Sequence, residues 1–318
     1  MEKYLQKLKR NFLKLEVRVR RTLSFIVLPG FDGMPLYDVL VFFFRGLFQG
    51  VLTYRAAAIA FDFFLALVPF ILFLFTLVPF VTTADIQVQL LGMMDQIIPA
   101  SIYELAESTI VEIVSRPASG LLSIVFVMSI YFSTNGIDTI LLSFRQGYYE
   151  IETWPWWKQK LRAFVLMVGL SFLFFISMTF LGFGKLVINI LAEQQIITSE
   201  LTIVSLIFIQ WIVIIGNILL SISLLYYFGQ AKDKEMSRYR FISAGSVLST
   251  SLFIFGGVLL KLYFENFSRY NLLYGSIGSL IILLIWLYYN SIILLIGFEL
   301  NTSIRKSKSE KTAYRVIE

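Results

Sequence analysis

The feature that most constrains this chain is a series of apolar blocks, each about 20 residues or longer and almost free of charge. Apolar residues make up 58% of the 318 residues and charged residues only 15%, whereas an average soluble domain has about 45–50% and about 25%. A water-soluble globule of this size would leave such blocks partly exposed. The blocks therefore exclude a soluble fold and indicate an integral membrane protein.

Each of the main blocks is long enough for a helix to cross a bilayer, which takes about 20 residues. We therefore predict an all-α fold, a polytopic membrane protein with six transmembrane helices. The predicted spans cover residues 56–80, 121–144, 164–190, 203–228, 241–264 and 272–300.

Residues 1–53 are predicted to form cytoplasmic basic amphipathic and interfacial helices. The apolar residues from Leu5 to Val19 recur in steps of three and four, which places them on one face of a helix. Two interpretations stay open for this segment: a helix lying on anionic lipid headgroups, or a solvated extension that only follows the positive-inside rule. Residues 36–52 contain two charges and are too short and polar to cross a membrane, so we expect an interfacial or re-entrant helix there.

The distribution of Lys and Arg predicts the orientation in the membrane. Of the 27 Lys and Arg residues, 21 lie in the N-terminal arm and in alternate connections after it. The positive-inside rule then places both termini in the cytoplasm of a bacterial inner-membrane protein. Residues 54–302 form the transmembrane domain, residues 303–318 a basic cytoplasmic tail, and the acidic connection at about 81–120 an external helical cap. This placement explains the net charge of +6, so nucleic acid is not an expected partner.

The chain has no Cys and no His. Disulfides, Cys-ligated metals, the usual zinc sites and the Ser-His-Asp triad are therefore excluded. We predict that the protein is not an enzyme and has no catalytic residue, cofactor or metal ligand.

Polar residues inside the predicted spans are costly, so each is a functional hypothesis. Several lie in the cytoplasmic halves of the first, second and sixth spans and can converge at one depth, with another deeper in the fourth span. The candidate polar cavity consists of Arg55, Asp62, Asn135, Asp138, Asn217, Asn290 and Glu299.

Two interpretations of this set stay open. In the structural one, Arg55 pairs with Asp62, Asp138 or Glu299 and fixes the packing of the helices. In the functional one, the same residues line a cytoplasm-facing cavity that binds a polar or anionic headgroup or an ion. We therefore expect a transporter or lipid-handling protein, and the alternative is a structural or scaffolding protein with a packed polar core. Membrane lipids are the expected partners, and a homo-oligomer stays open.

Several stretches together resemble the YihY/virulence factor BrkB family of bacterial inner-membrane proteins. The similar stretches are residues 54–61 and 67–69, Asn135 and Gly136 with Phe144 and Tyr148, residues 274–279, residues 283–288 and residues 295–301. In two places this chain departs from the family pattern, with Asp62 in place of an aromatic residue and Phe298 in place of a small one.

The resemblance covers roughly residues 35–302 and implies a plasma-membrane protein. Some members of the family have been labelled ribonuclease BN. The sequence gives that activity no support, because it has no His and no basic groove with interleaved aromatic residues.

A peptide of residues 3–21 tests the amphipathic segment. If the segment binds anionic lipid, its helical circular dichroism will rise on anionic vesicles and much less on zwitterionic vesicles, and salt will weaken the binding. Equal spectra on both vesicle types would leave only the positive-inside explanation.

Overall fold

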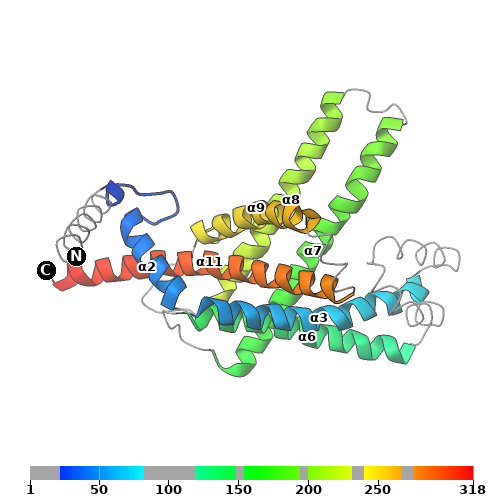
Figure 1. Cartoon of the computed structure of the whole chain (residues 1–318), viewed down its shortest axis with the longest axis horizontal. Helices are drawn as coiled ribbons and strands as arrows, with labels where there is room; N and C mark the ends of the chain where they lie inside the picture. The colour runs from blue at the N-terminus through cyan, green and yellow to red at the C-terminus, as the bar shows by residue number, and fades with distance from the viewer. Residues whose placement is uncertain are drawn as a thin grey trace, which may run out of the picture.

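The computed structural model of the chain describes residues 22–49, 51–81, 119–147, 154–193, 200–230, 240–266 and 276–317. This part of the chain is helical, which confirms the all-α class. The helices in chain order are α2 (Leu36–Gln49), α3 (Leu52–Val81), α6 (Ser119–Arg145), α7 (Trp156–Glu193), α8 (Glu200–Gly229), α9 (Ala244–Asn266) and α11 (Ser276–Ile317). Figure 1 shows α3, α6 and α11 running side by side, with α9 along α11.

Within the described residues, five helices contain segments that are long and apolar enough to cross a membrane. These segments are Leu52–Phe70, Ser123–Arg145, Trp156–Ser177, Val204–Gly229 and Leu280–Ser309. Because a helix satisfies its own backbone hydrogen bonds, such segments are stable in lipid. The chain is therefore a multi-pass membrane protein, as predicted. Five of the six expected spans correspond to these segments. The fifth block forms α9, Ala244–Asn266, whose apolar part within the described residues is Ala244–Leu260.

The helix of the fifth block, α9, begins three residues later than the prediction of 241–264. Its start is set by reciprocal capping between two serines. The Ser246 N–H donates to Ser243 Oγ (3.2 Å) and the Ser243 N–H donates to Ser246 Oγ (3.0 Å). These bonds satisfy two backbone donors that a helix start otherwise leaves free.

The last helix, α11, is longer than its apolar block. The block was predicted to span residues 272–300, with a basic tail over 303–318. In the structure α11 starts at Ser276 and continues without a break to Ile317. The basic tail is therefore a continuation of the last helix.

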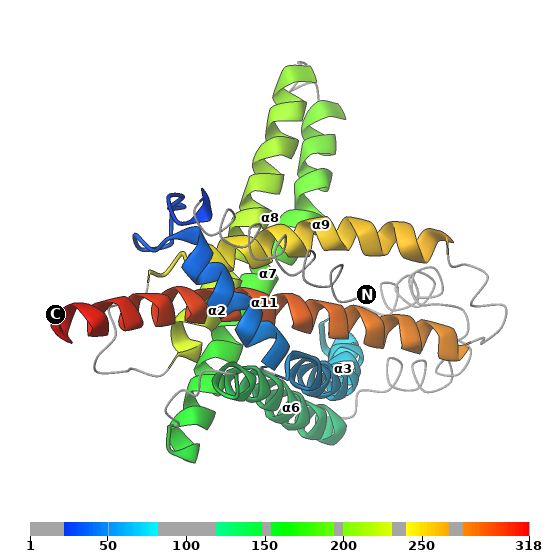
Figure 2. The same ribbon diagram turned by 60° about the vertical axis from the view of Figure 1, so that its left-hand side comes forward.

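The predicted interfacial segment, residues 36–52, contains the separate helix α2. This helix ends at Gln49, and Val51 has a φ of 50°, a left-handed conformation that interrupts the helix before α3 begins. Figure 2 shows α2 crossing α11. A small apolar core joins the two, made of Phe31, Met34, Val39, Leu300 and Ile304.

The main core contains an aromatic trio that joins α6, α8 and α11. Phe144 stacks on Phe298 with 4.1 Å between ring centroids, and Tyr226 meets both rings edge-on. The buried Tyr226 hydroxyl donates to the Leu294 carbonyl (2.7 Å) and lies 2.7 Å from Ser249 Oγ of α9. This group therefore ties four helices together.

The backbones of α9 and α11 approach closely at two glycines. A Cβ on Gly245 would lie 2.0 Å from the Gly297 carbonyl oxygen, and a Cβ on Gly297 would lie 2.0 Å from Ser249 Oγ. Neither position can accept a side chain without moving the helices apart. The Gly245 N–H also donates to Asn301 Oδ1 (2.8 Å). Small residues thus act here as helix contacts, as they commonly do in membrane proteins.

Two helices leave the others and form a projecting hairpin (Figure 1). We call residues 171–177 of α7 and 204–215 of α8 the α7–α8 arm. Ile207, Phe208 and Ile209 are all exposed, although consecutive residues on a helix point about 100° apart. Only 11% of the apolar span of α7 is buried in the protein, against 39% for α6. The arm therefore presents apolar surface on most sides.

Some predictions lie outside the described residues. They are the amphipathic helix within residues 1–21 and most of the external cap, residues 82–118.

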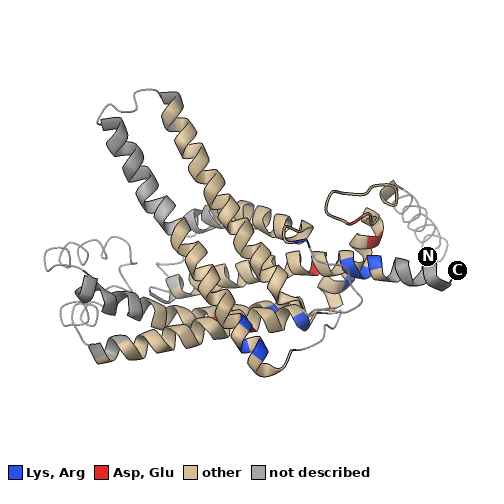
Figure 3. Cartoon of the chain, turned by 180° about the vertical axis from the view of Figure 1, so that it is seen from behind, with Lys and Arg blue, Asp and Glu red and all other residues tan. Residues whose placement is uncertain are grey.

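The described Lys and Arg residues gather at one end of the helices (Figure 3). We call the end that carries Arg55, Arg145, Lys160 and Arg305 the basic end. The positive-inside rule predicts that the basic end faces the cytoplasm.

Single cysteines test this orientation, since the chain has none of its own. We expect Gly120→Cys and Thr202→Cys, both exposed near the ends of α6 and α8 away from the basic end, to react with an impermeant maleimide on intact spheroplasts. Gln146→Cys and Ser309→Cys, exposed at the basic end, will react only after lysis. Labelling of Ser309→Cys on intact spheroplasts would reverse the orientation.

Candidate functional site

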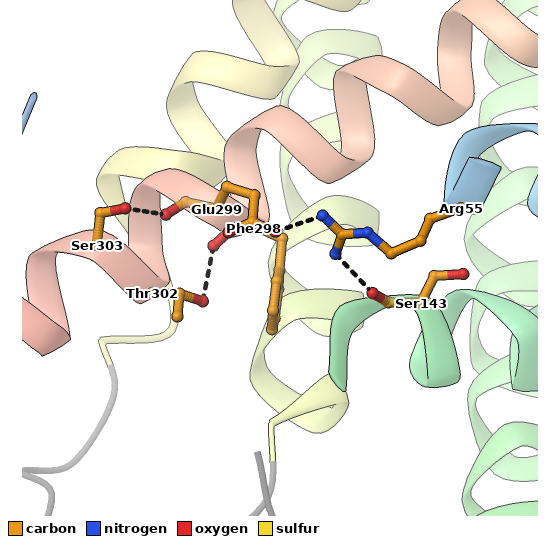
Figure 4. Close-up of polar contacts among 6 residues, drawn as sticks. All are labelled: Arg55, Ser143, Phe298, Glu299, Thr302 and Ser303. Atoms are coloured by element: carbon orange, nitrogen blue, oxygen red, sulfur yellow. Dashed lines mark hydrogen bonds and ion pairs between the residues drawn. The ribbon is translucent and has the colours of Figure 1, made fainter. Parts of the chain in front are cut away.

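A buried ion pair joins three helices at the basic end (Figure 4). Arg55 lies in the first turn of α3 and its Nη2 is 2.6 Å from Glu299 Oε1 of α11. Its Nη1 donates to the carbonyl of Ser143 in α6 (2.8 Å). Arg55 is 5% exposed and Glu299 is 1% exposed. One guanidinium therefore connects α3, α6 and α11 away from water.

The surroundings of the pair keep it dry. Phe298, which precedes the glutamate, is stacked on Phe144. Gly147 closes over the pair, because a Cβ there would lie 2.9 Å from Glu299 Oε1 and 3.2 Å from Arg55 Nη1. Charge-assisted hydrogen bonds are stronger when water is excluded.

A second polar group joins α6 to α7. Gln159 Nε2 donates to Asp138 Oδ1 (2.6 Å), and Lys160 Nζ lies 2.6 Å from Asp138 Oδ2. Arg145 Nη1 donates to Gln159 Oε1 (2.8 Å), and Lys160 Nζ donates to Asn135 Oδ1 (2.7 Å). The Lys160 side chain is 30% exposed, so this group reaches the surface, unlike the Arg55–Glu299 pair.

Two further candidates lie outside both polar groups. Asp62 accepts a hydrogen bond from Thr139, a second link between α3 and α6. Asn290 donates to the Trp286 carbonyl of its own helix (2.8 Å). Neither contact involves Arg55.

Asn217 lies in α8, toward the α7–α8 arm. Its Nδ2 donates to the Leu173 carbonyl and to Ser177 Oγ, both in α7. This residue therefore holds the two helices of the hairpin to each other.

The structure brings together some of the predicted cavity residues and separates others. Arg55 meets Glu299, and Asn135 and Asp138 share Lys160. Asp62, Asn217 and Asn290 each form hydrogen bonds with residues outside these two polar groups. Of the three acids that the sequence offered to Arg55, the structure selects Glu299.

Sequence reasoning missed several members of these groups. Lys160 and Arg145 appeared only among the charges that set the orientation, and Gln159 carried no signal because a single glutamine near a helix start is common. The Ser143 carbonyl is a backbone acceptor and has no residue-type signal. The basic tail of α11 also makes bonds, since Arg305 Nη1 donates to Gln230 Oε1 (2.6 Å).

Within the described residues no group of three or more His, Cys, Asp or Glu side chains could hold a metal ion. The two carboxylates that are buried in this part of the chain, Asp138 and Glu299, are each paired with a cation. What the arrangement offers chemically is charge pairing and hydrogen bonding.

Comparison with known proteins agrees with this architecture. The sequence pattern of the virulence factor BrkB family matches residues 43–315, which includes both polar groups. No solved structure matches the chain.

Relatives carry different names. The ribonuclease-like protein YfkH of Bacillus subtilis (strain 168) is 30% identical over 254 residues, 80% of this chain and 90% of that protein. A UPF0761 membrane protein of Psychromonas ingrahamii is 34% identical over 68 residues, 21% of this chain and 23% of that protein. Another, from Idiomarina loihiensis, is 29% identical over 99 residues, 31% and 34% of the two chains. The extent of the family match and of the similarity to the first relative shows that this chain belongs to the virulence factor BrkB family.

Proposed function

We propose that this BrkB-family protein handles lipids in the bacterial plasma membrane, as a transporter of lipids rather than an enzyme. In this proposal six helices cross the membrane, with α9 as the fifth, and both termini lie in the cytoplasm. A polar site at the basic end faces the cytoplasm and meets a lipid headgroup.

The observation that carries the proposal is the contrast between the two parts of the helix bundle. At the basic end, buried hydrogen bonds and ion pairs hold the helices together. In the α7–α8 arm, apolar side chains such as Phe172, Phe175 and Phe208 are 67%, 74% and 65% exposed. Lipid tails would cover this surface in a membrane.

The part-exposed polar group between α6 and α7 supplies the headgroup contact in this proposal. Lys160 and Asn135 are both partly exposed at the basic end. Lys160 has three N–H donors, so one remains beyond its contacts with Asn135 and Asp138. A lipid with its tails along α7 would bring its headgroup to this level.

The alternative function is that of a scaffolding membrane protein with a packed polar core. The observation that favours it is the Arg55–Glu299 pair, in which both charges are buried and meet each other within the protein. Such a protein would contact lipids only as the medium that surrounds its helices, without a specific lipid site.

We do not extend the ribonuclease-like name of the Bacillus subtilis relative to this chain. The chain has no His to act as a general base, and the two buried carboxylates in the described part of the chain are paired with cations.

Lipid movement in proteoliposomes tests the proposal. Fluorescent lipid is placed in both leaflets, and dithionite destroys only the outer-leaflet dye. We expect the wild-type protein to make inner-leaflet dye accessible, and Lys160→Gln to slow this because it removes the charge that meets the headgroup. Lys158→Gln is the matched control, since Lys158 is exposed on the same turn and lies over the Trp157 ring. Wild-type vesicles that behave like protein-free vesicles would favour the scaffold.

The role of the buried pair is tested by thermal unfolding of purified variants in detergent. Arg55→Ala leaves Glu299 buried without a partner, so we expect a loss of about 3–5 kcal/mol of stability. Adding Glu299→Gln should recover much of it.

Asp138→Asn is the matched control for this rescue. Because Asp138 bonds to Gln159 and Lys160 rather than to Arg55, it should not restore the stability of Arg55→Ala. A stable Arg55→Ala protein that no longer moves lipid would show instead that Arg55 binds the ligand.

A further inference from the structure

Arg145 is a buried arginine with unused hydrogen-bonding capacity. It is the last residue of α6 and is 3% exposed. Its Nη1 donates to Gln159, but Nε and Nη2 are buried and have no hydrogen-bond partner among the described residues. A guanidinium carries five N–H donors, and buried donors are nearly always partnered. The Nε and Nη2 atoms of Arg145 can therefore donate hydrogen bonds to an acceptor that the described residues do not supply.

The charges around Arg145 point to an anion. Among the described residues, Asp138 is a carboxylate close to Arg145, and both of its oxygens are engaged by Gln159 and Lys160. Arg162 lies close enough to repel Arg145. The Arg162 guanidinium stacks over the Trp154 ring at 3.6 Å, a contact that leaves its charge in place. Within the described residues, the α6–α7 junction thus carries an excess of positive charge.

The position along α7 places this junction at the level of lipid headgroups. The apolar span of α7 begins at Trp156, and Trp156 and Trp157 are 76% and 58% exposed. Exposed indoles at the end of a span sit at the membrane–water interface. Figure 3 shows Lys and Arg residues at this start of α7. The abundant anion at that depth is phosphate.

We propose that Arg145 and Arg162 form a binding site for a phosphate group. The planar donor fork of arginine matches two phosphate oxygens, which a lysine cannot do. Arg162 is only partly buried, so the site is open to the surface on its side. The inference rests on the proposed lipid function for its preferred source of phosphate, the headgroup of an anionic lipid. Free inorganic phosphate has the same chemistry and is the other source to test.

The experiment measures binding to the full-length protein in zwitterionic nanodiscs or detergent. Phosphatidylglycerol is titrated, with zwitterionic phosphatidylcholine, which has no net charge, as the control. Inorganic phosphate is titrated alone and as a competitor of bound phosphatidylglycerol. Wild type, Arg145→Gln, Arg145→Lys and Arg162→Gln are compared with Lys158→Gln, which removes one exposed charge from the same level. Thermal stability without anionic lipid is recorded for each variant.

We expect Arg145→Gln to weaken phosphatidylglycerol binding about tenfold or more, as loss of charge-assisted hydrogen bonds does. Arg145→Lys keeps the charge but loses the planar donor fork. Its affinity for phosphatidylglycerol should therefore lie between those of the wild type and Arg145→Gln. Binding of phosphatidylglycerol that inorganic phosphate does not displace identifies a lipid headgroup, whereas displacement identifies a site for free phosphate.

The proposal is overturned if Arg145→Gln and Arg162→Gln change binding no more than Lys158→Gln does. Should Arg145→Gln fail to fold, Arg145→Lys and Arg162→Gln decide the question. Lipid movement distinguishes this inference from the proposed function. Phosphatidylglycerol binding that depends on the two arginines, without lipid movement, would support the phosphate site and contradict the transport role. Lipid movement that these variants leave unchanged would support the transport role and contradict the phosphate site.

Discussion

The interaction on which the rest of the structure depends is the buried ion pair between Arg55 and Glu299. Removing two charges from water is costly, and the cost is offset only when geometry and additional hydrogen bonds are good. Here the arginine also reaches the Ser143 carbonyl, so the same side chain fixes α3 against both α6 and α11. Breaking either end would leave a buried charge alone.

The sequence around the pair is arranged to exclude water. Phe298 beside Glu299 stacks on Phe144, and Tyr226 packs on both rings. Gly147 leaves room for the backbone to cover the charges. On the next helix pair, Gly245 and Gly297 let α9 lie directly against α11. The buried ion pair, the aromatic trio and the closest backbone approach of α9 and α11 therefore lie in one part of the molecule, the basic end.

Away from the basic end, the α7–α8 arm has a different character. It has few buried side chains, and its polar bonds, such as that of Asn217, join α7 and α8 to each other. A hairpin held at its base, with apolar surface on most sides, presents a boundary at which lipid meets protein. This division between a closed base and a lipid-covered arm is the physical basis of the lipid-handling proposal.

Much of the fold could be predicted from the sequence because hydrophobic length alone indicates membrane helices. The start of α9 could not, since the serine cap inside an apolar block, Ser243 with Ser246, outweighs the hydrophobic pattern. Nor could the length of α11, where a polar sequence extends an apolar helix. For the site, composition identified Arg55 and Glu299 as costly residues but left three possible acids. The choice among them depends on how the helices are rotated, which a single sequence does not record. Arg145 and Lys160 could not be identified as site residues, because basic residues are expected at any cytoplasmic boundary of a membrane helix.

The most direct test of the division between base and arm is the oxygen accessibility of nitroxide labels placed one at a time along residues 204–215 of α8 in nanodiscs. An arm covered by lipid predicts high accessibility at Ile207, Phe208 and Ile209 together, with protection confined to the side of the helix that carries the buried Gln210. Protection of two of those three consecutive positions would mean that α8 packs against the other helices along its length, and would contradict the lipid-covered arm.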